Sequence, residues 1–150
     1  VTAVEFKEIS THEEKTEFKN MNRAIFPVVY DDEFYDTMLF RSSYHAALVY
    51  CNNQIVGTLS FEVKNRAVYV FTFGLLQRFR GIGLGEKIWT KVEDIFKTTF
   101  QCCRILLHTQ TSNLKAVDFY KKHGFIIKET VSEYYEGLPC NAAYLFEKYV

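Results

Sequence analysis

The chain is 150 residues long, which is the usual size of one domain and enough for a substantial core. Its 18 basic and 18 acidic side chains give a formal net charge of zero, so the composition does not favour a nucleic-acid surface or a polybasic membrane patch. No apolar run approaches the roughly 20 residues of a membrane-spanning helix, and the first residues lack a signal-peptide pattern. We therefore expect a single domain, residues 1–150, with neither nucleic acid nor membrane as a partner.

The cysteines do not predict a metal centre. Cys51, Cys102, Cys103 and Cys140 have spacings that match no zinc template, and adjacent cysteines rarely bond each other. Reduced thiols are typical of proteins in the cytosol. We expect a protein that uses no metal and is located in the cytoplasm, with the nucleus as an additional location.

The first third of the chain predicts a short strand and two helices. Residues 4–9 can form the strand. A capping box that starts at Thr11 opens a helix, and its apolar residues recur at helical spacing until Pro27 stops the run. Asp31 can cap a second helix with one apolar face. The loop between these helices, IFPVVY, is unusually apolar.

The pattern then changes to strands. AALVYC and the alternating residues 55–63 flank an Asn52-Asn53 turn, which predicts two hairpin-linked antiparallel strands. A second turn leads into VYVFTFG, which we expect to be the central strand of the sheet.

The second half predicts alternating helices and strands. A helix is expected to begin near Gly85 or Glu86, and the apolar run RILLH suits a strand buried on both faces. Residues 113–123 predict a further helix, stopped by a glycine. FIIKET and AAYLFEKY are expected to be the last two strands.

A glycine-rich segment joins VYVFTFG to the third predicted helix. Gly81, Gly83 and Gly85 stand at alternate positions, where they let the backbone approach a ligand closely. The N–H groups and positive dipole end of the helix favour a phosphate or diphosphate, and Arg78 and Arg80 add positive charge. The segment lacks the lysine of a P-loop and the third glycine of a dinucleotide fingerprint. It predicts a diphosphate site of a different kind.

The segment from Arg80 to Gly85, RGIGLG, resembles the Arg-x-x-Gly-x-Gly diphosphate loop of the GNAT acetyltransferases. The expected order of elements, β-α-α-β-β-β-α-β-α-β-β, is also the GNAT order, which makes the match more specific. The resemblance implies the α/β GNAT fold with a mixed sheet, and acetyl-CoA as cofactor with CoA as product. Within the superfamily, the chain is similar to N-terminal acetyltransferases of the NatE catalytic-subunit (San) type, through AIFPVVYDDEFY, LHTQTSN, AVDFYKKHGF and EYY.

The NatE resemblance implies a reaction and its partners. Acetyl would pass from acetyl-CoA to the α-amine of a protein N-terminus, such as that of a nascent chain, chiefly one with a retained methionine before an apolar residue. It also implies docking on the auxiliary and catalytic subunits of the NatA complex near ribosomes. The alternatives are a GNAT enzyme that acts on protein lysines or small amines, and a non-catalytic adaptor subunit of an N-terminal acetyltransferase complex.

The resemblance also assigns roles to residues. Tyr69 and His108 match the catalytic pair, which we expect to relay a proton through a shared water, and Tyr120 would bond the sulfur of the leaving thiolate. The residues expected to bind the cofactor are Phe73, Leu75, Arg78, Arg80, Gly81, Ile82, Gly83, Leu84, Gly85, Asn113, Tyr120 and Lys122. Those expected to bind the substrate are Phe26, Pro27, Val28, Tyr30, Phe71, Tyr134 and Tyr135. Without the resemblance, most of these aromatic residues would be interpreted as core packing.

Overall fold

Seven strands form one mixed sheet with two helices on each face. The computed structural model describes residues 3–27, 30–135, 137–138 and 140–150. The strands are β1 (Val4–Glu8), β2 (Tyr44–Cys51), β3 (Gln54–Lys64), β4 (Ala67–Leu75), β5 (Arg104–Gln110), β6 (Ile126–Val131) and β7 (Ala143–Tyr149). The helices are α1 (His12–Ile25), α2 (Asp32–Leu39), α3 (Leu84–Thr98), α4 (Leu114–Lys122) and the short 3-10 helix η1 (Gln77–Phe79). None of the described helices combines the length and the apolar composition needed to cross a membrane.

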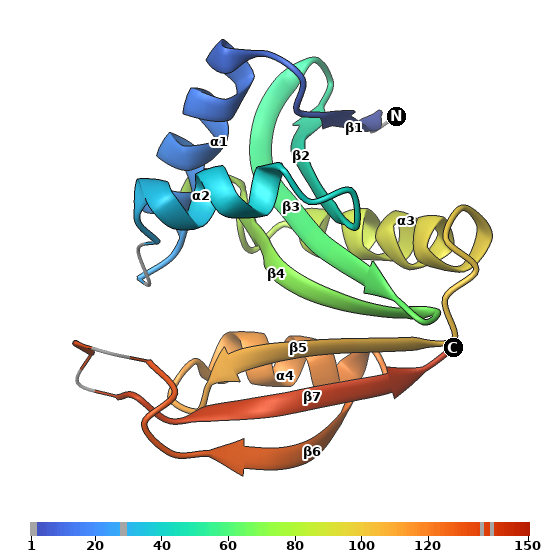
Figure 1. The fold of residues 1–150 in the computed structure, drawn as a ribbon. Coiled ribbons are helices and arrows are strands. Elements are labelled where there is room, and N and C mark those ends of the chain that lie inside the picture. Colours follow the sequence, from blue (N-terminus) through green and yellow to red (C-terminus); the bar gives the residue numbers. More distant parts are fainter. Residues whose placement is uncertain (1–2, 28–29, 136, 139) are drawn as a thin grey trace.

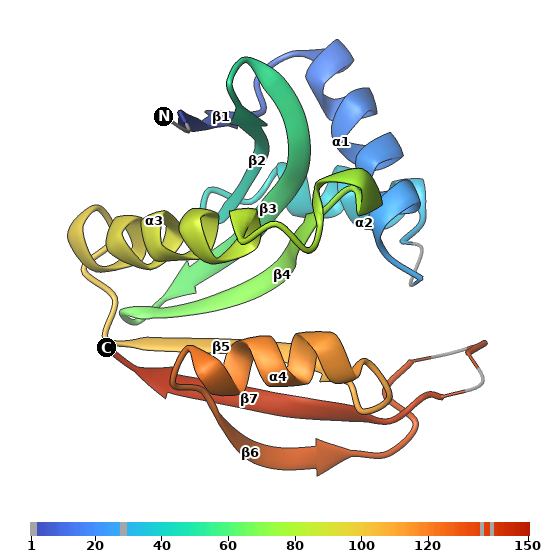
Figure 2. The ribbon, with the colours of Figure 1, turned by 180° about the vertical axis from the view of Figure 1, so that it is seen from behind.

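The order of elements confirms the fold expected from the sequence. Along the sheet the strands lie in the order β1-β2-β3-β4-β5-β7-β6, and β4 and β5 are the parallel pair. The helices α1 and α2 lie in front in Figure 1, whereas α3 and α4 lie in front in Figure 2, the view from behind. Two details differ from the expectation: η1 was not predicted, and α3 begins at Leu84, one residue earlier than expected.

The helix starts differ in how their free N–H groups are satisfied. At α1, the Thr11 hydroxyl accepts from the Glu14 N–H and the Glu14 carboxylate accepts from the Thr11 N–H, which confirms the predicted capping box. At α2, the Asp31 carboxylate accepts from the Phe34 N–H at 2.8 Å, as predicted. At α3, the capping residue is Gly83, which has no side chain to accept these bonds. The first turn of α3 therefore keeps donors for another partner.

A separate hydrophobic layer packs on each face of the sheet. Trp89 and Phe96 of α3 are fully buried on one face, and Phe18 of α1 with Tyr35 of α2 are buried on the other. Burial of each large apolar side chain contributes roughly 1.5–3 kcal/mol. The two layers hold the sheet between them and fix the strands from which the site is built.

β5 departs from the predicted burial. Ile105, Leu107 and Thr109 are at most 7% exposed, but Leu106 and His108 between them are only half-buried. The prediction that this strand is buried on both faces is therefore wrong. The reason is that α1 contacts β2, β3 and β4 and α2 contacts β2, and both helices lie away from β5 (Figure 1). This face of β5 is left accessible around His108.

β4 and β5 pair over only part of their length. Their register runs from Ala67 opposite Arg104 to Val70 opposite Leu107, although both strands continue beyond. A register shift against β3 at the same point leaves Phe71 as an extra residue in β4, and such a bulge bends a strand and changes the direction of its side chains. The ribbons of β4 and β5 diverge from there (Figure 1). The sheet is thereby opened in its middle.

Candidate active site

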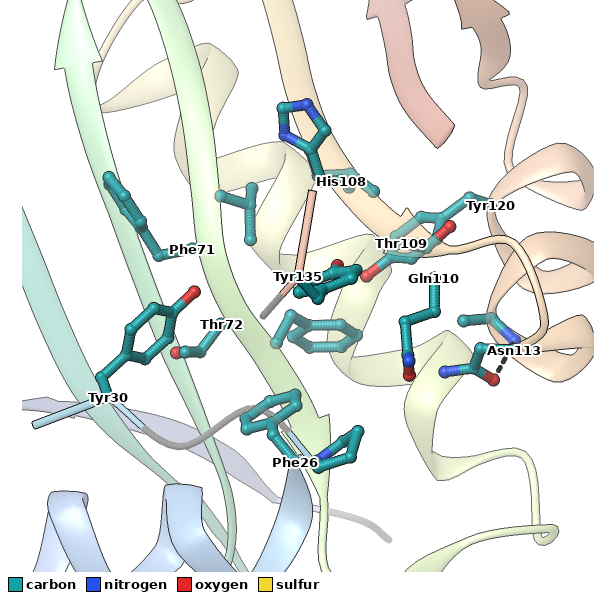
Figure 3. Close-up of a pocket in the computed structure, with 15 residues that line it drawn as sticks. Phe26, Tyr30, Phe71, Thr72, His108, Thr109, Gln110, Asn113, Tyr120 and Tyr135 are labelled. Atoms are coloured by element: carbon teal, nitrogen blue, oxygen red, sulfur yellow. Dashed lines mark hydrogen bonds between the residues drawn. The ribbon is translucent and has the colours of Figure 1, made fainter. Parts of the chain in front are cut away.

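Two cavities lie where β4 and β5 separate, and Figure 3 shows the smaller one. The smaller has a volume of about 130 Å³ and the larger about 490 Å³. Both linings include Phe26, Pro27, Phe73, Asn113, Ala116 and Tyr120. This shared wall places the cavities next to each other, so that one long molecule can extend through both.

The glycine loop lines the larger cavity. Gly81 and Gly83 have φ angles of +79° and +78°, a left-handed conformation that residues with a side chain rarely adopt. A Cβ atom at either position would meet no atom within 4 Å, so the loop requires glycine for its backbone and not for space. Gly85 lies in the first turn of α3 and also lines the cavity. The uncapped start of α3 is therefore available to an anion, as the sequence predicts.

The predicted cations occupy different places. Arg80 lines the larger cavity, and its Nε donates to the backbone carbonyl of Leu75 at 2.9 Å. The guanidinium of Arg78 lies 4.8 Å from the ring of its neighbour Phe79 and lines neither cavity. Lys122 donates to the Glu86 carboxylate at 2.6 Å and also lies outside both linings. Arg80 is the predicted cation that the structure brings to the cavity.

Of the other residues predicted to bind the cofactor, some line the larger cavity and others do not. Phe73 and Leu75 line the larger cavity. Ile82 is 71% exposed and Leu84 is buried in the core, and the side chains of both lie off the lining. At these two positions only the backbone is available to a ligand of the loop.

The smaller cavity has an aromatic and apolar wall. The predicted substrate residues on its lining are Phe26, Pro27, Tyr30, Phe71 and Tyr135. Val28 lies outside the described residues. Tyr134 stacks on His108, outside the lining, with ring centroids 4.2 Å apart. Most of the predicted substrate residues therefore come together around one space.

Two contacts hold this wall in place. Tyr30 stacks on Phe34 with ring centroids 4.2 Å apart, and burial raises the pKa of Tyr30 to about 12, so this side chain stays neutral. Gly74 of β4 lies beneath Phe26, because a Cβ atom at residue 74 would come within 2.8 Å of the Phe26 ring. The glycine thus allows Phe26 to lie close against the strand, where it lines both cavities.

Tyr69 and His108 are bonded directly to each other. The distance between the Tyr69 Oη and His108 Nδ1 atoms is 2.6 Å, and Tyr69 Oη is 3.3 Å from the hydroxyl of Tyr134. The register explains the meeting: Tyr69 lies opposite Leu106, and His108 is two residues further on the same side of β5. His108 also lines the smaller cavity. The two side chains that were expected to share a water are thus in direct contact, and this distance leaves no room for a water between Oη and Nδ1.

The local environment sets the protonation of this pair. Burial raises the pKa of Tyr69, so the phenol keeps its proton, and we assign it as the donor to His108 Nδ1. Burial lowers the pKa of His108 below its usual 6.5, and the opposing charge of Glu129 acts more weakly. At neutral pH, His108 is a neutral imidazole that accepts on Nδ1 and carries its own proton on Nε2.

Tyr120 and Asn113 lie on α4 and line both cavities. Tyr120 is 7% exposed, and burial raises its pKa, so its hydroxyl is a donor at neutral pH. The Asn113 side chain accepts from the Ala116 N–H at 3.3 Å, the dashed bond in Figure 3, and thereby caps α4. The two residues therefore stand where the cavities meet, and Asn113 is also the N-cap of α4.

The sequence analysis missed several lining residues, of which Lys115 and Thr109 matter most for what the cavities can bind. Lys115, in the first turn of α4, lines the larger cavity. Thr109 of β5 lines the smaller one, and its hydroxyl is buried without a hydrogen-bond partner among the described residues. The position of Lys115 two residues after the helix cap could have suggested it. No sequence signal distinguishes Thr109 from an ordinary strand residue.

Thr109→Val is expected to stabilise the protein without ligand. Valine has nearly the shape of threonine and removes the cost of an unpaired buried hydroxyl, so we expect about 1 kcal/mol and a rise in Tm of about 3 °C. Thermal unfolding by circular dichroism measures the change. A lower Tm for the variant would show that the hydroxyl is satisfied in solution.

The pattern of the acetyltransferase (GNAT) family matches residues 15–125. The chain belongs to this family. It is 34% identical over 149 residues to N-alpha-acetyltransferase 50 of Danio rerio, covering 97% of this chain and 88% of that protein. It is 30% identical to a probable N-acetyltransferase, san, of Drosophila melanogaster, covering 98% and 81%. The structure of Arabidopsis thaliana Naa50 in complex with the bisubstrate analogue CoA-Ac-MVNAL has a TM-score of 0.79 and 29% identity, covering 98% and 97%.

Membership of this family makes the chain an acetyl-CoA-dependent N-acetyltransferase, as the glycine loop predicts. The residues present fit acetyl-CoA: the uncapped N–H groups and Arg80 suit a diphosphate, and the apolar lining shared by the cavities suits the pantetheine arm. Within the described part of the chain, no three His, Cys, Asp or Glu side chains gather where they could hold a metal ion. All four cysteines are free thiols.

Proposed function

We propose that this acetyltransferase acts on the α-amine of protein N-termini and prefers methionine followed by an apolar residue. The aromatic wall of the smaller cavity, next to His108 and to the cofactor cavity, carries the proposal. A methionine side chain is flexible and its sulfur makes favourable contacts with aromatic rings, so it suits such a wall. The Arabidopsis relative supports the proposal, since its bound analogue, CoA-Ac-MVNAL, joins CoA to a peptide that starts with methionine.

Neutral amine is the form that attacks the thioester. An α-amine has a pKa of about 7.7–8.0, so roughly a tenth of it is neutral at about pH 7, whereas a lysine is neutral in only a few parts in ten thousand. A buried neutral histidine is too weak a base to make up that difference for lysine. The chemistry of the pair therefore favours an N-terminus over a side-chain amine.

In the proposed mechanism the proton moves through Tyr69. The amine nitrogen bonds to the thioester carbon while the carbonyl π pair moves to oxygen, so that nitrogen becomes positively charged and oxygen negatively charged. Its proton passes to Tyr69 Oη while the phenol proton passes to His108 Nδ1 along the 2.6 Å bond, so that no tyrosinate forms. This route agrees with the raised pKa of Tyr69. The charge of Glu129 then favours the imidazolium.

Collapse of the tetrahedral species breaks the carbon–sulfur bond. The electron pair leaves with sulfur, and we assign Tyr120 to donate a hydrogen bond to the forming thiolate. Its raised pKa keeps this hydroxyl protonated, and its place on the lining of both cavities suits the junction between cofactor and peptide. The electron pair on oxygen re-forms the carbonyl, and the proton gained by His108 returns to solvent, so that acetylated peptide and CoA are the products.

The pH dependence of kcat/KM tests the protonation states. As the pH falls, the substrate amine becomes protonated first, near its pKa of about 7.7–8.0, so log(kcat/KM) falls with a slope of one. Because burial lowers the pKa of His108 below 6.5, the slope should increase to two only below that value. A slope of two already present near neutrality would contradict a depressed histidine pKa.

A peptide panel tests the proposed specificity. We expect kcat/KM for a Met-Leu N-terminus to exceed that for Ser-Ser by at least about tenfold, because burial of one apolar side chain contributes roughly 1.5–3 kcal/mol. Transfer of labelled acetyl to each peptide gives the rates. Peptides with blocked N-termini are the controls, and equal rates for Met-Leu and Ser-Ser would overturn the preference.

Docking on the NatA complex and a cytoplasmic location are part of the same proposal. The first follows from the NatE resemblance of the sequence, and for the second the four free thiols are compatible with a reducing compartment. Co-purification of the tagged chain with NatA subunits, and its distribution after cell fractionation, test the two separately.

A further inference from the structure

One cationic side chain on the lining of the larger cavity, Lys115, does not belong to the glycine loop. The charged residues of this lining are Arg80, Lys115, and Glu86, whose carboxylate is paired with Lys122. A coenzyme A diphosphate carries two negative charges, and the start of a helix supplies only about half a positive charge. The site therefore needs side-chain cations in addition to the loop.

Arg80 has part of its guanidinium committed elsewhere. Its Nε donates to the Leu75 carbonyl at 2.9 Å, and one terminal nitrogen donates to the Ile25 carbonyl at 3.4 Å. These bonds connect the end of β4 to the end of α1 and hold the start of the glycine loop. Arg80 thus positions the loop, and only its remaining donors can reach a ligand.

Lys115 lines the larger cavity from a different element, α4. It lies in the first turn of α4, two residues after Asn113, the cap shown in Figure 3, whereas the glycine loop precedes α3. It lines the larger cavity together with Gly81 and Gly83. Among the residues that the structure describes, no carboxylate lies within ion-pair distance of Lys115, in contrast to Lys122. Its ammonium is therefore available to a ligand.

We propose that Lys115 binds the diphosphate of acetyl-CoA, with its ammonium on the side opposite the N–H groups of the glycine loop. The diphosphate is the group concerned because Lys115 shares its cavity with Gly81, Gly83 and the start of α3. We thus assign to Lys115, seven residues earlier on α4, the cofactor-binding role that was predicted for Lys122. Lys122 instead neutralises Glu86 at the edge of the cavity.

The test compares Lys115→Met with Lys121→Met. Both lysines are exposed on α4, but Lys121 lines neither cavity, and methionine keeps the helix propensity and the aliphatic stem. Calorimetric binding of CoA to Lys115→Met should be about tenfold weaker, the usual loss for one charge-assisted hydrogen bond, and Lys121→Met should bind as wild type. Equal binding by wild type and Lys115→Met would overturn the proposal. Thermal unfolding confirms that both variants fold.

Two shortened ligands show whether Lys115 binds the diphosphate or the 3′-phosphate. Dephospho-CoA lacks the 3′-phosphate but keeps the diphosphate, so its binding to Lys115→Met should also weaken about tenfold. Acetyl-pantetheine lacks both, so its kcat/KM should be unchanged by the substitution. If Lys115→Met weakens the binding of CoA but not of dephospho-CoA, Lys115 binds the 3′-phosphate and the proposal is overturned. A lower kcat/KM for acetyl-pantetheine would also overturn it. The calorimetry needs no peptide, so it decides the role of Lys115 whether or not the proposed peptide specificity holds.

Discussion

His108→Ala is expected to lower kcat about 100-fold at about pH 7, near the lower end of the range for loss of a general base. The reason is that His108 is the proton acceptor of the pair, bonded to Tyr69 at 2.6 Å and facing the smaller cavity. A loss of this size corresponds to about 2.7 kcal/mol of transition-state stabilisation. Single-turnover transfer of acetyl to a Met-Leu peptide measures it without interference from product release.

The pH dependence of that loss separates catalysis from folding damage. Wild type and variant both need the neutral amine, and His108 takes the proton only after the amine has attacked, so protonation of the substrate lowers both rates by the same factor. The deficit of His108→Ala should therefore stay nearly constant between about pH 7 and pH 9 and shrink only below the lowered pKa of His108, where the wild type loses its neutral imidazole. His12→Ala, an exposed substitution in the first turn of α1, is the matched control and should behave as wild type. A deficit that persists unchanged well below about pH 6.5 would contradict the assigned role of His108.

Tyr69→Phe is expected to lower kcat about 30- to 100-fold while leaving the KM for acetyl-CoA nearly unchanged. Phenylalanine keeps the ring contact with Phe71, whose centroid is 4.8 Å from that of Tyr69, but removes the hydroxyl that joins the amine to His108. The same single-turnover assay measures the effect. Tyr134→Phe is the matched control: it removes only the longer 3.3 Å bond and keeps the ring stacked on His108, so a loss of about threefold or less is expected.

A double variant tests whether Tyr69 and His108 act as one relay. If both residues transfer the same proton, Tyr69→Phe adds little to His108→Ala, and the combined loss stays near that of the single histidine variant. Multiplied losses would mean that the two side chains act independently. In that case the 2.6 Å bond would serve only to orient the ring.

The fold was largely predictable because its signals are local. The capping box at Thr11, the cap at Asp31 and the glycines at 81 and 83 each determine a backbone conformation within a few residues. Apolar spacing located the helices between them. Hydrophobicity alone could not show that one face of β5 is accessible, because this depends on where α1 and α2 lie over the sheet.

The site was predictable only in part. The resemblance identified Tyr69 and His108, but their direct bond depends on the β4–β5 register, which no local pattern determines. The choice between Lys115 and Lys122 depends on how α4 is rotated against the cavity. Thr109 could be recognised only once its hydroxyl was seen to lack a partner. These features arise from contacts between elements distant in sequence.

The most direct test of the proposed N-terminal specificity uses one peptide that has a free Met-Leu N-terminus and one internal lysine. After reaction with labelled acetyl-CoA, mass spectrometry of fragments locates the acetyl group. The account predicts acetyl on the α-amine and loss of most transfer when the N-terminus is blocked. Acetyl mainly on the lysine would contradict it and favour the lysine-directed alternative. Binding of acetyl-CoA without transfer to either amine would also contradict it and favour the adaptor.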